Sequence, residues 1–315
     1  MFLVTGGTGF IGRHLLERVP GPVRCLTRRA SVPSVSSVEF VQADLASGAG
    51  VAEALRGVTT VIHLAGVTKA LRPADYFTGN ARASETLARA AAGRGLRFVH
   101  VSSLAAVGPA DSAPLTEDAP PRPISYYGKS KLEGEQAVRA LIPDAVIVRP
   151  PVVYGPADTG VLEIFRSVAR GWSLEISGGE RWFSFVYVAD LVEGLLRAAC
   201  HPSAPGRTYF LASPEPATWT ELTALAARIM NMRPRRLRLP VPLAYAAGAG
   251  AEIWSRLTGK PGVISRDKVS EALCRRWTCD SRRAARELGF VASTSLETGV
   301  AATLSWYKEA GWLTY

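Results

Sequence analysis

The sequence is poor in cysteine, which limits the covalent means by which it could be stabilised. Its 315 residues include only four cysteines, and no two form a Cys-x-x-Cys pair. A disulfide scaffold in a chain of this length would need more of them. We therefore predict reduced thiols, a cytoplasmic location and no metal site. The four are Cys25, Cys200, Cys274 and Cys279.

Long hydrophobic segments are also missing. The chain opens on a short apolar run, Phe2–Thr5, without the basic residues and longer apolar core of a signal peptide. The longest apolar stretch, roughly residues 239–254, includes Glu252 and two prolines and is shorter than a typical membrane span. We predict a buried or partly exposed helix there and no integral membrane segment. A shallow membrane contact is an alternative that the sequence leaves open.

Nucleic-acid-binding motifs are absent, although the chain carries a formal net charge of +10. Helix-turn-helix, zinc-finger and aromatic RNA-binding patterns do not occur, and the arginines are spread along the chain. A dispersed positive charge favours an anionic small molecule over a nucleic acid. We predict a small-molecule substrate and no nucleic-acid partner.

Apolar strand-like runs alternate with amphipathic segments through the first half of the chain. This alternation is typical of a parallel sheet covered by helices on both faces. It predicts an α/β protein with a Rossmann doubly wound parallel sheet. The expected strands are 2–5, 23–27, 39–42, 60–64, 97–102 and 145–149, and the expected helices include 75–92 and 127–140.

The pattern changes in the second half, where a helix at 162–170, an aromatic strand at 182–186 and a helix at 188–199 are expected. Two capping boxes mark later helices, Thr218 with Glu221 and Thr294 with Glu297. We assign residues 1–155 to a dinucleotide-binding domain, to which some later elements return. Residues 156–315 are then mainly a smaller C-terminal substrate-binding lobe.

Three glycines follow the first strand at the spacing G-x-x-G-x-x-G: Gly6, Gly9 and Gly12. Such a loop lets the backbone approach a pyrophosphate closely, and the following helix presents free N–H groups to it. The loop lies between an apolar strand and an amphipathic helix, which is the context that a dinucleotide site requires.

The second expected strand ends without a carboxylate and is followed by Arg28 and Arg29. NAD sites usually place Asp or Glu there for the ribose 2′-hydroxyl, whereas guanidinium groups suit a 2′-phosphate. The pattern favours NADP, with NAD as the alternative. Asp44 and Leu45 follow the third strand, where Asp44 could hold the adenine or cap the next helix.

Tyr127 and Lys131 are four residues apart at the start of an expected helix and therefore share a face. A lysine ammonium beside a phenol lowers the phenol pKa and prepares it for proton transfer. Ser102 and Ser103 end the strand at 97–102, where a hydroxyl can bind a carbonyl oxygen. Tyr126 is a weaker candidate because its partner four residues on is Ser130.

These motifs together resemble the extended short-chain dehydrogenase/reductases of the NAD-dependent epimerase/dehydratase superfamily. The resemblance rests on TGGTGFIG at 5–12, ADL at 43–45, HLAG at 63–66, VSSLAAVGP at 101–109, YYGKSKLEGE at 126–135, RPPVVYGP at 149–156 and FVYVADLV at 185–192. It implies Ser103, Tyr127 and Lys131 as the catalytic residues. It also implies a cofactor site that includes Phe10, Ile11, Leu64, Ala65, Gly66, Asn80, Tyr127, Lys131, Pro150 and Val153.

The resemblance leaves three functions open. The first is an NAD(P)-dependent oxidoreductase that interconverts a carbonyl and an alcohol on a largely apolar small molecule. The second is a nucleotide-sugar epimerase or dehydratase with retained NAD, and the third is a non-catalytic NADP-binding regulator, which commonly lacks the Tyr or Lys kept here. A homodimer is a further expectation.

The substrate is expected to contact residues near the second-half aromatic strand. Val152 takes a position where nucleotide-sugar enzymes usually carry asparagine, and Phe183 one where they usually carry arginine, with Arg181 two residues earlier. Aromatic walls suit flat or apolar molecules. We therefore predict a substrate site formed by Ser103, Tyr127, Val152, Arg181 and Phe183. The alternative is that these aromatic residues only fill the core.

Overall fold

A computed structural model describes residues 1–29, 37–260, 262 and 265–315. At its centre is a seven-stranded sheet in the order β11-β6-β5-β4-β1-β2-β3, with parallel pairing throughout. The predicted Rossmann fold is confirmed, and the six predicted strands end within one residue of their expected positions. The strands are β1 (Phe2–Thr5), β2 (Val23–Thr27), β3 (Val38–Gln42), β4 (Thr60–His63), β5 (Arg97–Val101), β6 (Val146–Val148) and β11 (Thr208–Tyr209).

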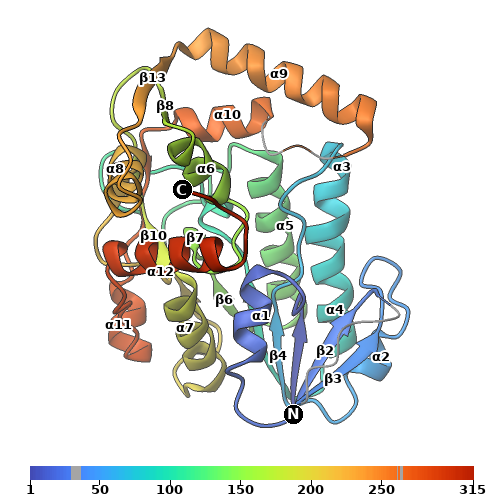
Figure 1. The fold of residues 1–315 in the computed structure, drawn as a ribbon. Coiled ribbons are helices and arrows are strands. Elements are labelled where there is room, and N and C mark those ends of the chain that lie inside the picture. The colour runs from blue at the N-terminus through green and yellow to red at the C-terminus, as the bar shows by residue number, and fades with distance from the viewer. Residues whose placement is uncertain (30–36, 261, 263–264) are drawn as a thin grey trace.

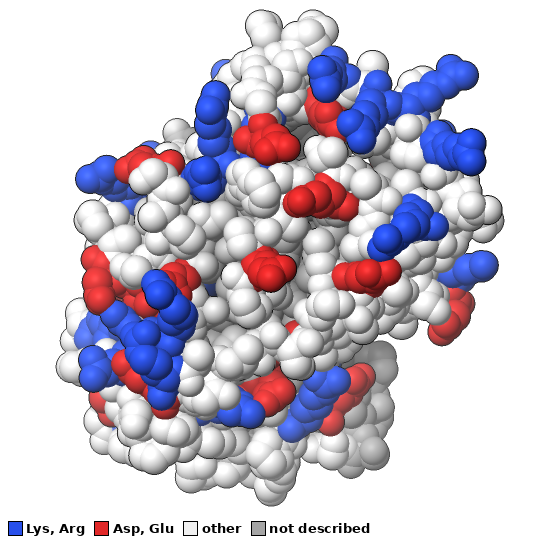
Figure 2. Space-filling view, turned by 90° about the vertical axis from the view of Figure 1, so that its left-hand side faces the viewer, with Lys and Arg blue, Asp and Glu red and all other residues white. Residues whose placement is uncertain are grey.

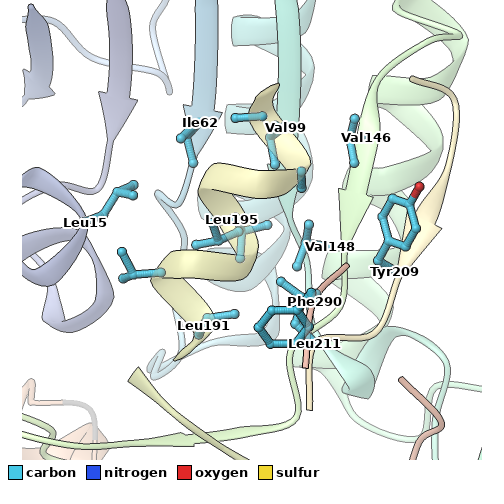
Figure 3. Close-up of a cluster of buried hydrophobic side chains, with 14 of the residues drawn as sticks. Leu15, Ile62, Val99, Val146, Val148, Leu191, Leu195, Tyr209, Leu211 and Phe290 are labelled. Carbon is cyan, nitrogen blue, oxygen red and sulfur yellow. The ribbon is translucent and has the colours of Figure 1, made fainter. Parts of the chain in front are cut away.

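Helices cover both faces of this sheet (Figure 1). On one face lie α1 (Phe10–Leu16) and α7 (Val188–Cys200); on the other lie α2 (Val51–Ala54), α4 (Ala83–Ala91) and α5 (Tyr126–Leu141). Figure 3 shows side chains of α1 and α7, including Leu15, Leu191 and Leu195, around Ile62 and Val99 of the sheet. Because both faces are covered, the strands are apolar on both sides, as the sequence pattern required.

The helix expected at 75–92 is three consecutive elements. They are α3 (Pro73–Tyr76), a π-helical turn η1 (Phe77–Arg82) and α4. The wider turn brings Asn80 into the protein interior, where its side chain is buried. Single π-helical turns of this kind are often found at functional sites.

The second half of the chain builds three small sheets beside the main one. β7 (Val152–Tyr154) pairs with β10 (Phe185–Tyr187), β9 (Trp182–Phe183) lies between β12 (Ala217–Thr218) and β14 (Arg276–Trp277), and β8 (Trp172–Ile176) pairs with β13 (Arg235–Leu239). The aromatic strand expected at 182–186 is interrupted at Ser184. The remaining helices are η2 (Leu104–Ala106), α6 (Leu162–Ala169), α8 (Trp219–Ile229), α9 (Val241–Thr258), α10 (Arg266–Leu273), α11 (Arg282–Leu288) and α12 (Leu296–Glu309).

One of the two predicted capping boxes is confirmed. Thr218 Oγ1 accepts a hydrogen bond from the Glu221 backbone N–H at 3.0 Å, and the Glu221 carboxylate accepts one from the Thr218 N–H. The prediction at Thr294 is wrong because Ser295 caps α12. The Thr294 N–H instead donates to Asp190 Oδ2 at 3.0 Å, a partner distant in sequence.

The chain crosses between the two halves several times. β11 extends the main sheet beside β6, and α7 contacts β4, β5 and β6, so both elements belong to the sheet despite following residue 155. Phe290, after α11, is buried in the same core. The boundary at residue 155 remains a prediction.

Within the described ranges, no helix is both long and apolar enough to cross a bilayer.

Candidate active site

The candidate site lies at the carboxyl edge of the main sheet. Strands β1, β4 and β5 end side by side, because β4 pairs with both of the others. Their ends lead into the glycine loop, Leu64–Gly66 and Ser102–Ser103, respectively. The strand order reverses at β1, and open α/β sheets bind ligands at such a reversal. The fold therefore brings together motifs that are far apart in the sequence.

The glycine loop is compact enough that its glycines cannot be replaced without displacing backbone. Gly6 has a φ of +72°, and a Cβ there would lie 2.7 Å from the Ala65 nitrogen. A Cβ on Gly12 would lie 2.2 Å from the Gly6 oxygen. Gly9 is exposed and is the N-cap of α1, and Phe10 and Ile11 form the first helical turn. The loop thus lies against the end of β4 with its middle glycine facing solvent.

The backbone of Gly66 lies close to the side chains of two other predicted cofactor residues, Asn80 and Lys131. A Cβ on Gly66 would lie 2.9 Å from Asn80 Oδ1 and 3.8 Å from Lys131 Nζ. Asn80 is itself fully bonded within the protein: Oδ1 accepts from the Val67 N–H at 2.7 Å, and Nδ2 donates to Val67 O and Ser130 Oγ. Asn80 therefore fixes the segment after β4 against α5, and the absence of a side chain at Gly66 allows Asn80 to approach the backbone there.

His63 belongs to a buried hydrogen-bond chain beneath the site. Its Nδ1 lies 2.6 Å from Thr5 Oγ1 and its Nε2 lies 2.9 Å from Ser84 Oγ. Burial, with a smaller contribution from the Lys131 charge, lowers the pKa of His63 to about 3. A neutral imidazole with both nitrogens engaged supports a structural role.

Arg28 and Arg29 lie at the exposed end of β2, as predicted. Neither forms an ion pair with any residue that the structure describes. The Asp44 carboxylate accepts hydrogen bonds from the Ala46 N–H and the Ser47 hydroxyl, both at 3.0 Å. It closes its own turn, whereas Gly50 is the N-cap of α2. Leu45 is buried in the core beneath this turn.

Tyr127 and Ser103 meet at the carboxyl edge. Ser125 caps α5 by accepting from the Gly128 N–H at 3.0 Å, which fixes the direction of Tyr127 in the first turn. Ser103 Oγ accepts a hydrogen bond from the Ala105 N–H at 3.2 Å, and its hydroxyl is near enough to Tyr127 to lower the pKa of the phenol. Tyr126 is 44% exposed on the outer side of the helix. The geometry therefore favours Tyr127 over Tyr126, while Ser102 is buried against the sheet.

The positive charge that contributes most to lowering the Tyr127 pKa belongs to Lys268 and not to Lys131. Burial raises the pKa of the Tyr127 hydroxyl, and the groups that lower it are the Lys268 ammonium and Ser103. Lys131 is buried one turn further along α5 and donates to the Val101 carbonyl at 2.7 Å. Burial lowers the pKa of Lys131 to about 8, and the Glu135 carboxylate opposes that change.

Helix α10 contributes two residues that the sequence analysis missed. Lys268 Nζ lies 5.0 Å from the centre of the Tyr127 ring and 2.7 Å from Glu271 Oε2. Asp267 Oδ2 accepts a hydrogen bond from the Tyr126 N–H at 2.9 Å, at the free N-terminal end of α5. Both contacts join segments distant in sequence, and no local motif marked this helix.

Two of the predicted substrate residues are occupied elsewhere in the protein. The Arg181 guanidinium donates to the carbonyls of Ile176, Ser177 and Gly179 and so holds its own loop. Phe183 is buried, with its ring centre 5.1 Å from that of Trp219. These contacts support the alternative that Phe183 fills the core, and they give Arg181 a structural role.

Pro150, Val152 and Val153 follow β6, and Pro150 is bonded to a segment of the predicted site. The Pro150 carbonyl accepts from the Leu104 N–H at 2.9 Å, which joins β6 to the segment containing Ser103. Val152 and Val153 are half-buried on β7 and pack against the second-half core and the sheet core, respectively. Their contacts with cofactor or substrate remain predictions.

A cavity of about 470 Å³ opens next to Tyr126 and Lys268. It lies between residues 68–73 and helices α9 and α10, and its lining is more polar than the aromatic wall expected from the sequence. The charged residues that line the cavity are Lys69, Arg72, Glu252, Arg256, Arg266, Asp267 and Lys268.

The described residues contain no cluster of three or more His, Cys, Asp or Glu side chains able to hold a metal.

Comparisons with known proteins agree with this architecture. The family model described as "NAD dependent epimerase/dehydratase family" matches residues 2–212. A ceramide reductase from Caulobacter vibrioides is 35% identical, with 98% of this chain and 95% of that protein covered. A 4-hydroxy-2-methyl-3-oxo-4-farnesyl-3,4-dihydroquinoline-1-oxide ketoreductase from Stigmatella aurantiaca is 30% identical over 94% and 93% of the two chains.

Solved structures show the same fold over the whole chain. The structure of MoeE5 in complex with UDP-glucuronic acid and NAD aligns with a TM-score of 0.80 and 25% identity, over 98% of this chain and 99% of that one. The family match covers more than half of the chain and includes the glycine loop, Ser103, Tyr127 and Lys131. The chain is therefore an enzyme of the NAD-dependent epimerase/dehydratase family, an extended short-chain dehydrogenase/reductase.

Proposed function

We propose that this enzyme uses NADP(H) to interconvert a ketone and a secondary alcohol on a molecule with a long apolar chain. The observation that carries the proposal is the proximity of Tyr127 and Ser103 at the carboxyl edge of the sheet, where Ser103 lowers the pKa of Tyr127, with buried Lys131 one turn along α5. A proton donor and a second hydroxyl at the edge of the sheet where the glycine loop also begins support a hydride transfer with a dinucleotide.

Each residue of the site has a separate role in the proposed reaction. NADPH, when bound, supplies the hydride for the carbonyl carbon. The glycine loop binds the pyrophosphate through backbone N–H groups, and Lys131 orients the nicotinamide ribose. Ser103 donates a hydrogen bond to the carbonyl oxygen, and Tyr127 gives that oxygen its phenolic proton. Since burial raises the pKa of Tyr127, the phenol carries its proton near neutral pH, which favours the reducing direction.

The relatives support the substrate class. The names of the two reductases described above refer to ceramide and to a farnesylated quinoline, and both of these molecules carry long hydrocarbon chains. The charged cavity beside Lys268 suits the polar end of such a molecule, whereas its chain would extend away from the sheet. Arg28 and Arg29 support NADP over NAD, because both are exposed just after β2, where folds of this kind usually bind the adenosine ribose.

A nucleotide-sugar epimerase or dehydratase is the second candidate. The same cavity favours it, because Lys69, Arg72, Arg256, Arg266 and Lys268 could face a diphosphate. An epimerase returns its hydride to the substrate, so it retains NAD and consumes no free cofactor. The two candidates therefore differ in a quantity that can be measured directly.

The test is a substrate panel with purified protein and NADPH. The panel contains a long-chain 3-oxo lipid, a 3-oxosteroid, an aryl ketone, UDP-glucose and a dTDP-sugar. We expect NADPH oxidation and a secondary alcohol, identified by NMR, with one or more of the apolar ketones. Isomerised or dehydrated sugar without net NADPH consumption would overturn the proposal and favour the second candidate.

A further inference from the structure

Helix α9 presents an uncharged, mostly apolar stripe to solvent. The exposed positions 243, 246, 247, 250, 253, 254 and 257 recur at intervals of three or four residues and so share one side of the helix. Leu243 is 55% exposed, Ile253 60%, Trp254 69% and Leu257 78%. The remaining positions of the stripe are Ala246, Ala247 and Gly250. Large apolar side chains on one exposed stripe indicate a contact surface.

The opposite side of α9 is small and polar, and this side faces the protein. Ala244, Gly248 and Ser255 are buried there. A Cβ on Gly248 would lie 3.1 Å from the Arg266 nitrogen, so α9 lies close against the start of α10. Glu252 binds the Arg266 guanidinium at 3.0 Å. A surface helix normally buries its apolar side, and α9 does the reverse.

Basic residues flank the stripe at both ends. Residues 233–260 include six Lys or Arg and one acidic residue, Glu252, which is paired inward with Arg266. Arg235, Arg236 and Arg238 are exposed on β13, which leads into α9. Arg256 and Lys260 are exposed at its other end. In Figure 1 α9 lies across the top of the molecule, and Figure 2 shows uncharged surface at the top, with several Lys and Arg and a few Asp or Glu side chains below it.

The small sheet of β8 and β13, which precedes α9, adds further exposed apolar side chains. Leu174 of β8 and Leu237 of β13 are paired neighbours in the sheet, and they are 60% and 47% exposed. Trp172, two residues before Leu174, is exposed on the same side of its strand. The segment from β13 to the end of α9 therefore combines exposed apolar side chains with a net positive charge, although Arg238 is paired with Glu175 of β8 at 3.7 Å.

We propose that α9 lies in the headgroup region of an anionic phospholipid bilayer, with its apolar stripe toward the acyl chains and the flanking basic residues on lipid phosphates. An interfacial helix has this combination of one apolar side and surrounding Lys and Arg. A second copy of this chain fits the surface less well, because its own basic residues would face these. The contact is peripheral and involves no crossing of the membrane.

The position of α9 connects this surface to the candidate site. Glu252, Ser255 and Arg256 of α9 line the cavity that reaches Lys268. A bilayer on the outer side of α9 would therefore lie next to the opening through which an apolar chain could leave the lipid. The proposed binding surface consists of residues of α9, β13 and β8 and does not depend on the proposed reaction.

The experiment is flotation of the full-length protein with vesicles of phosphatidylcholine, with and without phosphatidylglycerol. We expect the wild type to float with phosphatidylglycerol vesicles and to be released by added NaCl. The double variant I253E/W254E should bind at least about tenfold more weakly. Replacing Arg235 and Arg236 with Glu should weaken binding by roughly fivefold or more for each charge removed, and only on anionic vesicles.

A matched control is V291E. Val291 is 63% exposed and follows α11, which lies at the other end of the molecule in Figure 1. Its variant should bind vesicles like the wild type, and near-ultraviolet circular dichroism establishes that each variant is folded. Absence of binding by the wild type, or equal binding by I253E/W254E, would overturn the proposal. A wild-type dimer that I253E/W254E converts to monomer in light scattering, without vesicle binding, would assign the stripe to a second copy.

Discussion

The ammonium group of Lys268 lies 5.0 Å from the centre of the Tyr127 ring, although the two residues come from helices far apart in the chain. Glu271 holds the ammonium at 2.7 Å. Among the charges that act on the Tyr127 pKa, Lys268 is the one that lowers it. In this structure a residue of α10 therefore supplies the positive charge that acts most strongly on the phenol, and the role predicted for Lys131 stays a prediction.

Replacing Lys268 with Met should raise the Tyr127 pKa. Because reduction requires the protonated phenol, the loss of kcat/KM at alkaline pH should then occur at higher pH than in the wild type. The measurement is the pH profile of NADPH-dependent reduction, and Lys268→Arg should restore the original profile. The control is Lys129→Met, since Lys129 Nζ lies 5.6 Å from the centre of the exposed Tyr126 ring. Superimposable profiles for Lys268→Met and Lys129→Met would contradict the prediction.

Tyr127→Phe should lower kcat by about 100-fold or more, because the reaction loses its proton donor. Cofactor binding should change by no more than about tenfold, since the phenol hydroxyl contributes at most one hydrogen bond to it. Both quantities follow from steady-state kinetics and from NADPH fluorescence titration. Tyr126→Phe is the matched control and should retain activity, because Tyr126 is exposed on the outer side of α5. The reverse result would reassign the proton donor to Tyr126.

Replacing Arg28 and Arg29 together with Ala should weaken NADPH far more than NADH. Only NADPH carries the 2′-phosphate that two guanidinium groups would bind, at roughly 1.5–3 kcal/mol for each charged hydrogen bond. Calorimetric titration with both cofactors measures the difference. Arg94→Ala, an exposed arginine outside the predicted site, should leave both affinities unchanged. Equal losses for NADPH and NADH would reject the predicted NADP preference.

Lys131 should make the stability of the cofactor-free enzyme depend on pH. Its pKa falls from 10.5 to about 8 on folding, so between these values the unfolded chain binds more protons than the folded chain. Stability should therefore rise with pH in this window, by up to about 3 kcal/mol, and Lys131→Met should lack that rise. Urea unfolding at several pH values measures it. A difference between the two proteins that stays constant from pH 8 to pH 10.5 would show that the buried amine is not shifted.

The main sheet and the central motifs could be predicted because local sequence determines them. Apolar runs bounded by turns give the strands from β1 to β6, and the glycine spacing gives the loop before α1. Ser125 caps the helix in which Tyr127 is the second residue. The position of Tyr127 is therefore likewise set by residues next to it in the sequence. These features need little information from the rest of the chain.

The features that the sequence did not reveal depend on distant partners. Asn80 is turned inward by a π-helical turn that is stabilised by Val67 and Ser130. The contact of Lys268 with Tyr127 requires α10 to return across the site. Arg181 looked available for a ligand, but its own loop carbonyls bind it, and this could not be read from spacing alone.

The repeated crossing of the chain between its halves has a consequence for engineering new specificity. β11 and α7 come from the second half yet complete the sheet and its core, and Phe290 returns to the same core from beyond α11. A graft from a relative joined at a single junction near residue 155 would therefore replace part of the nucleotide-binding scaffold along with the pocket. A chimera that keeps the scaffold needs separate junctions before α7, after β11 and on both sides of α11, so exchange of short segments is the safer design.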